Sequence, residues 1–520
     1  MRRSEFISRL EEDTEWDIVI VGGGATGLGA AVDASSRGYK TLLLERYDFA
    51  KGTSSRSTKL VHGGVRYLEQ GNIKLVMEAL HERGLLLKNA PHLTRTQPFI
   101  IPVYSWWKKW YYGIGLKIYD LMSRRLSLGK TAIISAKAVE KFTPAVSLKG
   151  LSGGVLYYDG QFDDARLAFT LAQTAADKGG VVLNYMKVTG LKKVDQKCRG
   201  VFAEDSLTGQ TYTIRSKAVI NATGVFTDDI LKMDDHLQHH IVSPSQGVHL
   251  VVDRQFFPGE YAMMIPKTDD GRVLFAVPWH QEVIIGTTDT PVSKISFEPR
   301  PLEEEMEFIF RNINQYLSSG ISKQDVKAVF TGLRPLVKIP GKKNTAVMPR
   351  DHTVIVSPSN LVTITGGKWT TYRKMAKVAV DNALFVGKLE KRPCETDSLR
   401  LHGWQVALNE EEPFGYYGAD GEAVRKLVEE NERWGEKLHA ALPYIKAQVI
   451  WAVRNEMAIT VEDVLARRIR MLFLNAQAAL DCAAEVAAMM AKELGREDSW
   501  QEEQVKDFTE LAKGYLPGGV

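Results

Sequence analysis

Three glycines spaced as G-x-G-x-x-G are the residues of this sequence best suited to binding a phosphate. Gly22, Gly24 and Gly27 stand in DIVIVGGGATGLGAAVDASSRGYKTLLLE, residues 17–45. In this spacing the first glycine makes a tight turn, the second lets the backbone approach a pyrophosphate, and the third lets a helix pack closely on a strand. Glu45 follows Gly27 by 18 residues, where a carboxylate can accept hydrogen bonds from a ribose diol. These residues predict an adenine-dinucleotide site.

The segments around these glycines predict the elements that hold them. An apolar run at 18–21 predicts a strand, residues 25–37 predict a helix of small residues, and 41–44 predict a second strand. This order directs the free N–H groups and positive dipole of the helix N-terminus at the phosphates. An ordinary glycine-rich turn is the alternative, but Glu45 at the end of the second strand favours the dinucleotide.

Small residues recur at the ends of two predicted strands far downstream. Asn-Ala-Thr-Gly at 221–224 follows one apolar run, and Gly366-Gly367 follow another, just before Lys368 and a predicted helix. Residues 46–72 alternate hydroxyl, basic and glycine residues, which is typical of a loop that lines a ligand, with a solvated loop as the alternative. One elongated cofactor that touches all these parts favours a buried FAD over NAD.

Composition bounds the kind of protein. At 520 residues the chain predicts two or three domains, and 44% hydrophobic with 25% charged residues is typical of a soluble globular protein. The net charge of +4 does not favour nucleic acid as the main partner. Cys198, Cys394 and Cys482 form no Cys-x-x-Cys site, which favours a reducing compartment, and no metal site is predicted. No uncharged apolar stretch reaches the roughly 18 residues that a membrane span needs.

Residues 97–126 concentrate aromatic and basic side chains. Trp106, Trp107 and Trp110 stand among lysines and tyrosines. Such a segment suits a membrane interface, where indole rings lie at headgroup level and lysines meet anionic lipid. A pair of core helices whose lysines reach outward is the alternative.

Several ordered segments together resemble the FAD-dependent glycerol-3-phosphate dehydrogenases. They are GTSSRSTKLVHGGVRYLE (52–69), YYDGQFDDARL (157–167), NATG (221–224), IIGTTDT (284–290), GLRPL (332–336), MPRDH (348–352) and GGKWTTYRK (366–374). VRNEMAITVEDVLARRIR, residues 453–470, resembles the C-terminal helical domain of the same family. The resemblance therefore extends over essentially the whole chain.

The resemblance implies an α/β fold with three parts. These are a Rossmann-like FAD-binding domain of the glutathione-reductase/D-amino-acid-oxidase type, a β-rich substrate domain and a C-terminal α-helical domain. We expect the first two to interleave within residues 1–392 and the helical domain to occupy 393–520. The FAD-binding domain is expected at about 16–90, 151–245 and 330–392, and the substrate-binding or cap domain at about 91–150 and 246–329.

The implied reaction is oxidation of sn-glycerol 3-phosphate at C2 to dihydroxyacetone phosphate, with electrons passing from FAD to membrane quinone. We expect a cytoplasmic protein attached peripherally to lipid, with a homodimer as one option for its assembly. A phosphate monoester carries a charge of about −1.5 to −2, so its site should present more than one guanidinium. The residues assigned to the substrate are Arg66, Tyr67, His249, Arg334, Arg350 and Thr371.

The same resemblance, with the chemistry of the side chains, assigns the remaining roles. His249 is the first choice for the base that takes the C2 hydroxyl proton, and His62 is the second choice or orients the cofactor. Lys368 would add positive charge near the N1–C2 edge of reduced flavin or near the substrate. The expected cofactor contacts are Gly22, Gly24, Ala25, Thr26, Gly27, Glu45, Arg46, Thr53, Ser54, Ser57, Lys59, Leu60, His62, Gly63, Ala222, Thr223, Gly224, Gly332, Gly367, Lys368, Trp369 and Thr370.

Three alternatives stay open at this point. An amino-acid or amine oxidase of the same architecture would need fewer arginines, because it binds a carboxylate and an amine. A glycerol-3-phosphate oxidase would pass its electrons to oxygen, but oxidases of this family tend to carry an inserted segment that this chain lacks, which favours quinone. A flavin-containing protein that binds a membrane surface without turnover is the third.

Overall fold

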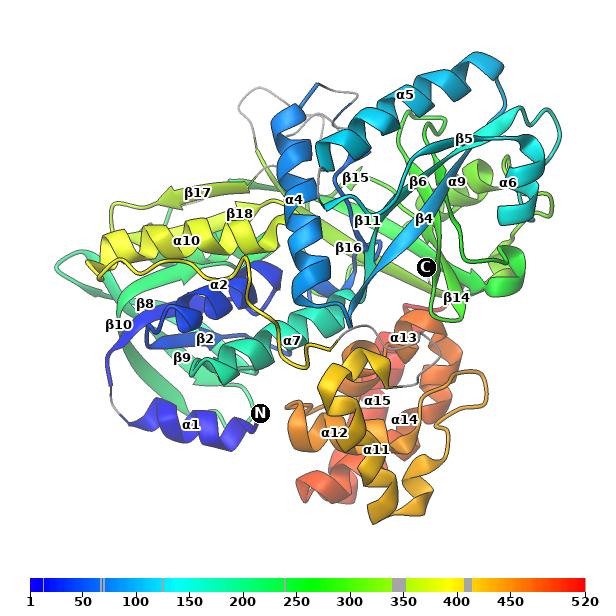
Figure 1. Ribbon diagram of the computed structural model, residues 1–520. Helices are drawn as coiled ribbons and strands as arrows, with labels where there is room; N and C mark the ends of the chain where they lie inside the picture. Colours follow the sequence, from blue (N-terminus) through cyan, green and yellow to red (C-terminus); the bar gives the residue numbers. More distant parts are fainter. Residues whose placement is uncertain are drawn as a thin grey trace.

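Two β-sheets and a C-terminal group of helices make up the molecule in this computed structural model (Figure 1). The structure describes residues 1–12, 14–65, 68, 71–123, 126–237, 240–338, 352–405 and 414–519. The expected α/β class, with a helical domain at the C-terminal end, is confirmed.

The first sheet has a parallel core in which β1 lies between β2 and β10. β7 and β18 continue this core on either side, and β17, β8 and β9 add antiparallel strands. The strands are β1 (Trp16–Val21), β2 (Thr41–Leu44), β7 (Val181–Leu183), β8 (Met186–Val194), β9 (Lys197–Asp205), β10 (Thr211–Asn221), β17 (His352–Val356) and β18 (Leu361–Gly366). Parallel strands buried on both faces explain the continuous apolar runs of the sequence.

One face of this sheet is covered by three neighbouring helices, α10, α2 and α7, which lie in a row in Figure 1. Their bounds are Tyr372–Gly387, Ala25–Ser36 and Asp164–Asp177, and α1 (Arg3–Glu11) packs beside β7. The glycines of the β1–α2 turn are required by its geometry. Gly22 has a φ of 110°, and a Cβ at Gly27 would lie 1.9 Å from the Gly22 carbonyl oxygen. The strand–turn–helix–strand expected at 17–45 is therefore confirmed.

The second sheet has ten strands in the order β15-β11-β14-β13-β12-β4-β6-β3, with β16 beside β11 and β5 beside β6. They are β3 (Leu60–Val61), β4 (Thr94–Val103), β5 (Ala132–Ile134), β6 (Gly153–Phe162), β11 (Val242–Asp253), β12 (Ala262–Ile265), β13 (Leu274–Trp279), β14 (Glu282–Gly286), β15 (Thr290–Pro291) and β16 (Val326–Val337). Helices α6 (Ala136–Phe142) and α9 (Glu303–Ile313) pack on it.

The division of the chain between the two sheets differs from the expected ranges at three strands. β3 lies within 16–90, β6 within 151–245 and most of β16 within 330–392, all expected in the FAD-binding domain. β3 pairs with β6, β6 with β4 and β16 with β11, and this antiparallel pairing places all three in the second sheet.

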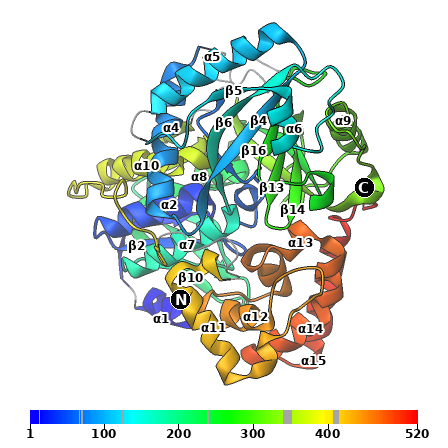
Figure 2. The ribbon, with the colours of Figure 1, turned by 45° about the vertical axis from the view of Figure 1, so that its right-hand side comes forward.

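Helix α5 (Trp106–Ser123) lies at the end of the molecule opposite the C-terminal helices, as Figure 1 and Figure 2 both show. Helix α4 (Ile73–Asn89) packs beside α5 and runs from there toward the middle of the molecule. α5 exposes Trp106, Trp107 and Trp110, with 54–72% of each side chain accessible. Among the described residues, no helix combines the length and the apolar character needed to cross a bilayer.

The C-terminal helices pack against β11, β14 and β16 of the second sheet through a shared apolar core. They are α11 (Gly421–Glu430), α12 (Lys446–Asn455), a π-helical turn at Asp463–Arg468, α13 (Met471–Leu474), α14 (Ala476–Leu494) and α15 (Asp498–Lys513). Asp463 accepts hydrogen bonds from the backbone N–H groups of Ile459 and Thr460, which caps the start of the π-helical turn. All three cysteines are free thiols.

Candidate active site

A cavity of about 1570 Å³ lies where the two sheets meet. Its wall combines the glycine-rich ends of β1, β10 and β18 with residues of β11 and β16, the segment after β14 and the loop 50–58. Small-molecule pockets usually measure roughly 300–1,000 Å³. This cavity therefore has room for a dinucleotide together with a second, smaller molecule.

The β1–α2 turn forms one end of the cavity. Gly22, Gly24 and Thr26 line it, and the N–H of Ala25 donates to Ser54 Oγ at 2.9 Å. This contact ties the hydroxyl-rich loop to the N-terminus of α2, the part of a helix that binds phosphate best. The residues here fit the diphosphate of a dinucleotide.

Glu45 also lines the cavity, at the end of β2. Its carboxylate accepts hydrogen bonds from the N–H groups of Gly23 at 2.6 Å and Tyr47 at 2.9 Å. Burial raises the pKa of Glu45, and the two N–H donors oppose that rise. The carboxylate is therefore fixed in place at the edge of the cavity, where the sequence predicts a ribose contact.

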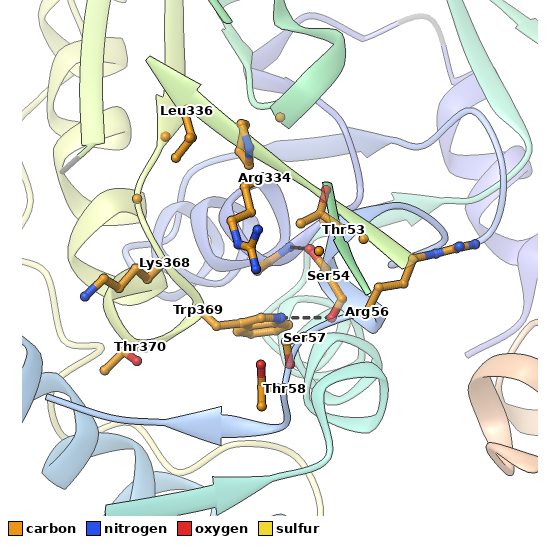
Figure 3. Close-up of a pocket in the computed structure, with 18 of the residues that line it drawn as sticks. Thr53, Ser54, Arg56, Ser57, Thr58, Arg334, Leu336, Lys368, Trp369 and Thr370 are labelled. Carbon is orange, nitrogen blue, oxygen red and sulfur yellow. Dashed lines mark hydrogen bonds between the residues drawn. The ribbon is translucent and has the colours of Figure 1, made fainter. Parts of the chain in front are cut away.

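The loop after β2 is held from two sides. Thr53 Oγ1 donates to the Leu333 carbonyl oxygen of β16 at 2.6 Å, and Trp369 Nε1 donates to the Ser54 carbonyl oxygen at 2.8 Å. Figure 3 shows the second of these bonds, with Ser54 and Trp369 lying in the same space as Arg334. Segments 280 and 315 residues apart in the chain thus build a single wall.

His249 projects from β11 and is 2% exposed. Its Nε2 lies 2.9 Å from Thr58 Oγ1, and its ring stacks on Phe330 at 4.6 Å between centroids. Nδ1 is buried and has no hydrogen-bond partner among the described residues. Burial, reinforced by the charges of Lys59 and Arg334, holds the pKa of His249 well below its usual range, so the imidazole is neutral at pH 7.

Arg334 lies within β16, and its guanidinium is held by the segment after β14. It donates to Thr287 Oγ1 at 3.1 Å and to the Thr288 carbonyl oxygen at 2.9 Å, and Asp289 Oδ1 lies 3.4 Å from Nη1. A Cβ at Gly247 would lie 2.4 Å from Arg334 Nη2. Glycine on the neighbouring strand therefore makes the space that the guanidinium occupies.

His62 and Lys368 line the cavity on the side of β18. The backbone N–H of His62 donates to Thr370 Oγ1 at 3.2 Å, which joins the loop 62–64 to the short turn Trp369–Thr371 before α10. The structure therefore places both candidate histidines and Lys368 on one cavity.

Most of the predicted site residues lie on this cavity. Its wall includes Gly22, Gly24, Ala25, Thr26, Glu45, Arg46, Thr53, Ser54, Ser57, Leu60, His62, Ala222, Thr223, Gly224, His249, Gly332, Arg334, Gly367, Lys368, Trp369 and Thr370. Arg66, Tyr67 and Arg350, predicted to bind substrate, lie outside the described residues.

Four predicted contacts do not line the cavity. Gly27 packs α2 against Gly22, and the Gly63 N–H donates to the hydroxyl of Tyr119. Lys59 turns its ammonium away to Asp164, 2.7 Å distant, and is fully buried. Thr371 is buried, and its hydroxyl donates to the Lys368 carbonyl oxygen. Ligand contact by these four residues stays a prediction.

Sequence reasoning passed over several residues of the site. Thr58 contacts His249 and Asp289 contacts Arg334, and both stand in segments already singled out for their resemblance. Phe226 and Phe297 line the cavity and stack at 4.0 Å, with the Arg46 guanidinium 5.6 Å from Phe297. No local pattern marks this aromatic pair, because its members come from segments 71 residues apart. Among the described residues, no His, Cys, Asp and Glu cluster could hold a metal ion.

Two family models match the chain. Residues 17–377 match the FAD dependent oxidoreductase family, and residues 363–505 match the C-terminal domain of alpha-glycerophosphate oxidase. The mitochondrial glycerol-3-phosphate dehydrogenase of Macaca fascicularis is 41% identical over 98% of this chain and 74% of its own length. The corresponding protein of Homo sapiens is 42% identical over 96% of this chain and 73% of its own length.

The solved structure of a glycerol-3-phosphate dehydrogenase from Bacillus halodurans, complexed with FAD, is also similar to this chain. It superposes with a TM-score of 0.81 at 31% identity, over 99% of this chain and 97% of that one. Glycine oxidase from Bacillus cereus has a TM-score of 0.52 at 16% identity and shares the fold alone. The predicted cofactor, FAD, is confirmed by the family model and the FAD-bound relative. The chain therefore belongs to the family of FAD-dependent glycerol-3-phosphate dehydrogenases.

Proposed function

We propose that this protein oxidises sn-glycerol 3-phosphate at C2 to dihydroxyacetone phosphate and passes the electrons through FAD to a membrane quinone. The observation that carries the proposal is the pairing of a buried neutral histidine, His249, with a fixed guanidinium, Arg334, on a cavity that also contains a dinucleotide turn. The names of the relatives support the same substrate.

Arg334 is the described residue best placed to bind the substrate phosphate. A phosphate monoester carries a charge of about −1.5 to −2 near neutral pH, and a guanidinium binds such a group with two parallel hydrogen bonds. The bonds to Thr287 and Thr288 fix the guanidinium before substrate arrives. Preorganisation of this kind reduces the entropy lost on binding. Arg66 and Arg350, with Tyr67, remain predicted partners of the same phosphate.

His249 is the proposed proton acceptor. Oxidation of C2 moves a hydride from carbon and a proton from the hydroxyl oxygen, leaving a C2 carbonyl. FAD, when bound, accepts the hydride. The low pKa of His249 keeps its imidazole unprotonated and therefore able to take the proton. Nε2 lies beside a cavity-lining hydroxyl, that of Thr58, so we propose Nε2 as the accepting atom.

The proposal of a quinone as electron acceptor rests on the part of the cavity that is lined by α5. Tyr112, Ile114 and Ile118 of α5 line this end, and α5 also carries the exposed tryptophans. An apolar passage that ends at a helix rich in exposed aromatic side chains suits a quinone arriving from lipid. We therefore propose a cytoplasmic protein that rests on the bilayer through α5.

Anaerobic titration tests the reaction. Glycerol 3-phosphate should bleach the flavin absorbance, whereas glycine, sarcosine and D-amino acids should leave it unchanged. The variant His249→Asn should retain FAD but bleach at least about a hundredfold more slowly, the size expected for a lost general base. Bleaching by an amino acid, or full activity in His249→Asn, would reject the proposed substrate or base respectively.

Oxygen is the rival acceptor, because residues 363–505 match a domain named for an oxidase. Turnover in air should release little peroxide compared with reduction of a soluble quinone under the same conditions. Stoichiometric peroxide, with no gain from added quinone, would favour the oxidase instead.

A further inference from the structure

Two segments that resemble the family but have no role so far meet inside the molecule. One is Asp163–Arg166, around the start of α7, and the other is Ala466–Arg470, which ends the π-helical turn. Arg470 Nη2 lies 3.1 Å from Asp164 Oδ1, and the two residues are 1% and 0% exposed. Neither residue lines the cavity. This ion pair joins the C-terminal helices to the start of α7, beside the loop that follows β2.

The other oxygen of Asp164 fixes that loop. Oδ2 accepts hydrogen bonds from the N–H of Ser57 at 2.9 Å, the hydroxyl of Ser57 at 2.7 Å and the Lys59 ammonium at 2.7 Å. The carbonyl oxygen of Ser55 accepts from Lys59 Nζ at 2.8 Å and from Arg470 Nη2 at 2.9 Å. The Asp164 carboxylate and the Ser55 carbonyl therefore each bind both Lys59 and Arg470. Together these contacts fix the segment 55–59 near both of its ends.

The backbone conformations of Lys59 and Arg470 show that these contacts hold both residues in unfavourable conformations. Lys59 and Arg470 have φ values of 63° and 59°, in the left-handed region that L-residues with side chains avoid. Such conformations persist only where the surrounding contacts determine them. Here the shared partners are Asp164 and the Ser55 carbonyl.

Thr58 stands at the centre of the segment that this network fixes. Its Oγ1 lies 2.9 Å from His249 Nε2, and the His249 ring stacks on Phe330 of β16. The Lys59 ammonium lies 4.9 Å from the Phe330 centroid, and Phe473 of α13 packs on Phe330 at 5.1 Å. The loop therefore contacts His249 directly, and the C-terminal helices reach it through Phe330.

We propose that Asp164 and Arg470 are positioning residues for the reaction. They set Thr58 against His249 Nε2, so that the C-terminal helices help to orient the proton acceptor. The inference rests on the proposed role of His249. It assigns a catalytic contribution to the helical domain, which otherwise packs against the sheet from outside.

The charged groups that face His249 are Lys59 and Arg334. The Thr58 hydroxyl also faces it, 2.9 Å from Nε2. Loosening the loop would admit water to the buried ring and let the Lys59 ammonium move away from it, and both changes raise the pKa of His249. Since the base must be unprotonated, the acid limb of the kcat profile should then move to higher pH.

Arg470→Gln tests the inference, with Arg166→Gln as its matched control. Arg166 is also on α7 and 2% exposed, and it pairs with Glu456 of the C-terminal part at 2.8 Å, but it does not contact the loop 55–59. The control measures what loss of a buried interdomain arginine does by itself. Both variants are compared as FAD-loaded enzymes, by melting temperature, kcat, KM for glycerol 3-phosphate and pH profile.

We expect kcat to fall about tenfold to a hundredfold in Arg470→Gln, as small misplacements of catalytic groups do, with KM little changed. Its acid limb should move up by about half a pH unit or more. Arg166→Gln should lose thermal stability without either change. Equal kcat losses in the two variants, or an unmoved acid limb in Arg470→Gln, would overturn the inference.

Two further variants keep the test decisive. Ser57→Ala removes one hydrogen-bond donor to Asp164 without changing the charge, so it should move the acid limb of the kcat profile to higher pH by a smaller amount than Arg470→Gln. This variant tests the inference even if Arg470→Gln does not fold. His249→Asn separates this inference from the proposed function. Full activity in His249→Asn would show that His249 is not the base. If His249→Asn loses activity but Arg470→Gln keeps the kcat and pH profile of the unaltered enzyme, only the positioning role is rejected.

Discussion

The Arg334 guanidinium and the Asp289 carboxylate lie 3.4 Å apart, one on β16 and the other just before β15. Asp289 also accepts a hydrogen bond from the Ser245 hydroxyl of β11, the strand between them. Only 5% of the Asp289 side chain is accessible. The carboxylate therefore orients the guanidinium from the buried side.

Arg334→Lys should weaken binding of the substrate phosphate, because an ammonium cannot reproduce the two parallel bonds of a guanidinium. Loss of one charge-assisted hydrogen bond costs about 1.5–3 kcal/mol, which corresponds to roughly ten- to a hundredfold in kcat/KM. Asp289→Asn should raise KM by a smaller factor, since Arg334 keeps its bonds to Thr287 and Thr288. Steady-state kinetics with a soluble dye measures both effects.

The control for Asp289 is Asp269→Asn. Asp269 pairs with Arg311 at 2.8 Å on the exposed surface, away from the cavity. This variant should have the KM of the unaltered enzyme. An Asp289→Asn variant that behaves in the same way would show that Asp289 does not orient Arg334.

Gly27→Ala should abolish FAD binding. A Cβ at this position would lie 1.9 Å from the Gly22 carbonyl oxygen, which belongs to the backbone and can move only if the turn opens. We expect protein purified without flavin colour, measured as the ratio of flavin to protein absorbance. Gly320→Ala is the control, because its Cβ would meet Asn314 no closer than 3.8 Å. Full flavin content in Gly27→Ala would refute the packing argument.

The cofactor turn could be predicted from the sequence because its information is local. Gly22, Gly27 and Glu45 occur within 24 residues, and the type and spacing of these residues indicate the steric or hydrogen-bonding role of each. The substrate half of the site is different. Gly247 and Gly286 make room for Arg334 and His249 through strand pairings of β11 with β16 and β14, so their roles depend on register.

The orientation of the Lys59 side chain could not be predicted from its own segment. The segment 52–69 lines the cavity in part, but a side chain after a tight turn can face either way. The buried carboxylate of Asp164, 105 positions further along the chain, draws the Lys59 ammonium away from the cavity. That partner is not visible in the local pattern, and neither is the Thr58–His249 contact that results.

His402 predicts a pH dependence of stability. Its ring lies 2.7 Å from Asp177 on α7 and 2.9 Å from Asp420 beside α11, so it bridges two parts of the fold. Burial opposes protonation, but the two carboxylates outweigh it and raise the pKa of His402 to about 9. A raised folded-state pKa adds stability that is complete below the unfolded value of about 6.5 and is lost as the pH rises through 9.

His402→Gln should therefore lower the unfolding free energy by about 1 kcal/mol at pH 6, a value reduced by partial solvent screening. The difference should vanish above pH 9. Thermal melts at a series of pH values measure it. His439→Gln is the control, because its ring lies 3.5 Å from one carboxylate, that of Asp481, and its Nδ1 accepts a hydrogen bond from the Ala441 N–H. A His402→Gln deficit that stays constant from pH 6 to pH 10 would exclude the ion-pair explanation.

The exposed tryptophans of α5 predict attachment to lipid. Trp106, Trp107 and Trp110 replaced together by alanine should release the protein from vesicles that contain anionic lipid, because each indole loses apolar area buried at the interface. Activity with a soluble dye should be spared, whereas reduction of quinone held in the vesicles should fall. Phe385→Ala is the control, since Phe385 is 85% exposed but lies on α10. Unchanged sedimentation of the triple variant with vesicles would refute attachment through α5.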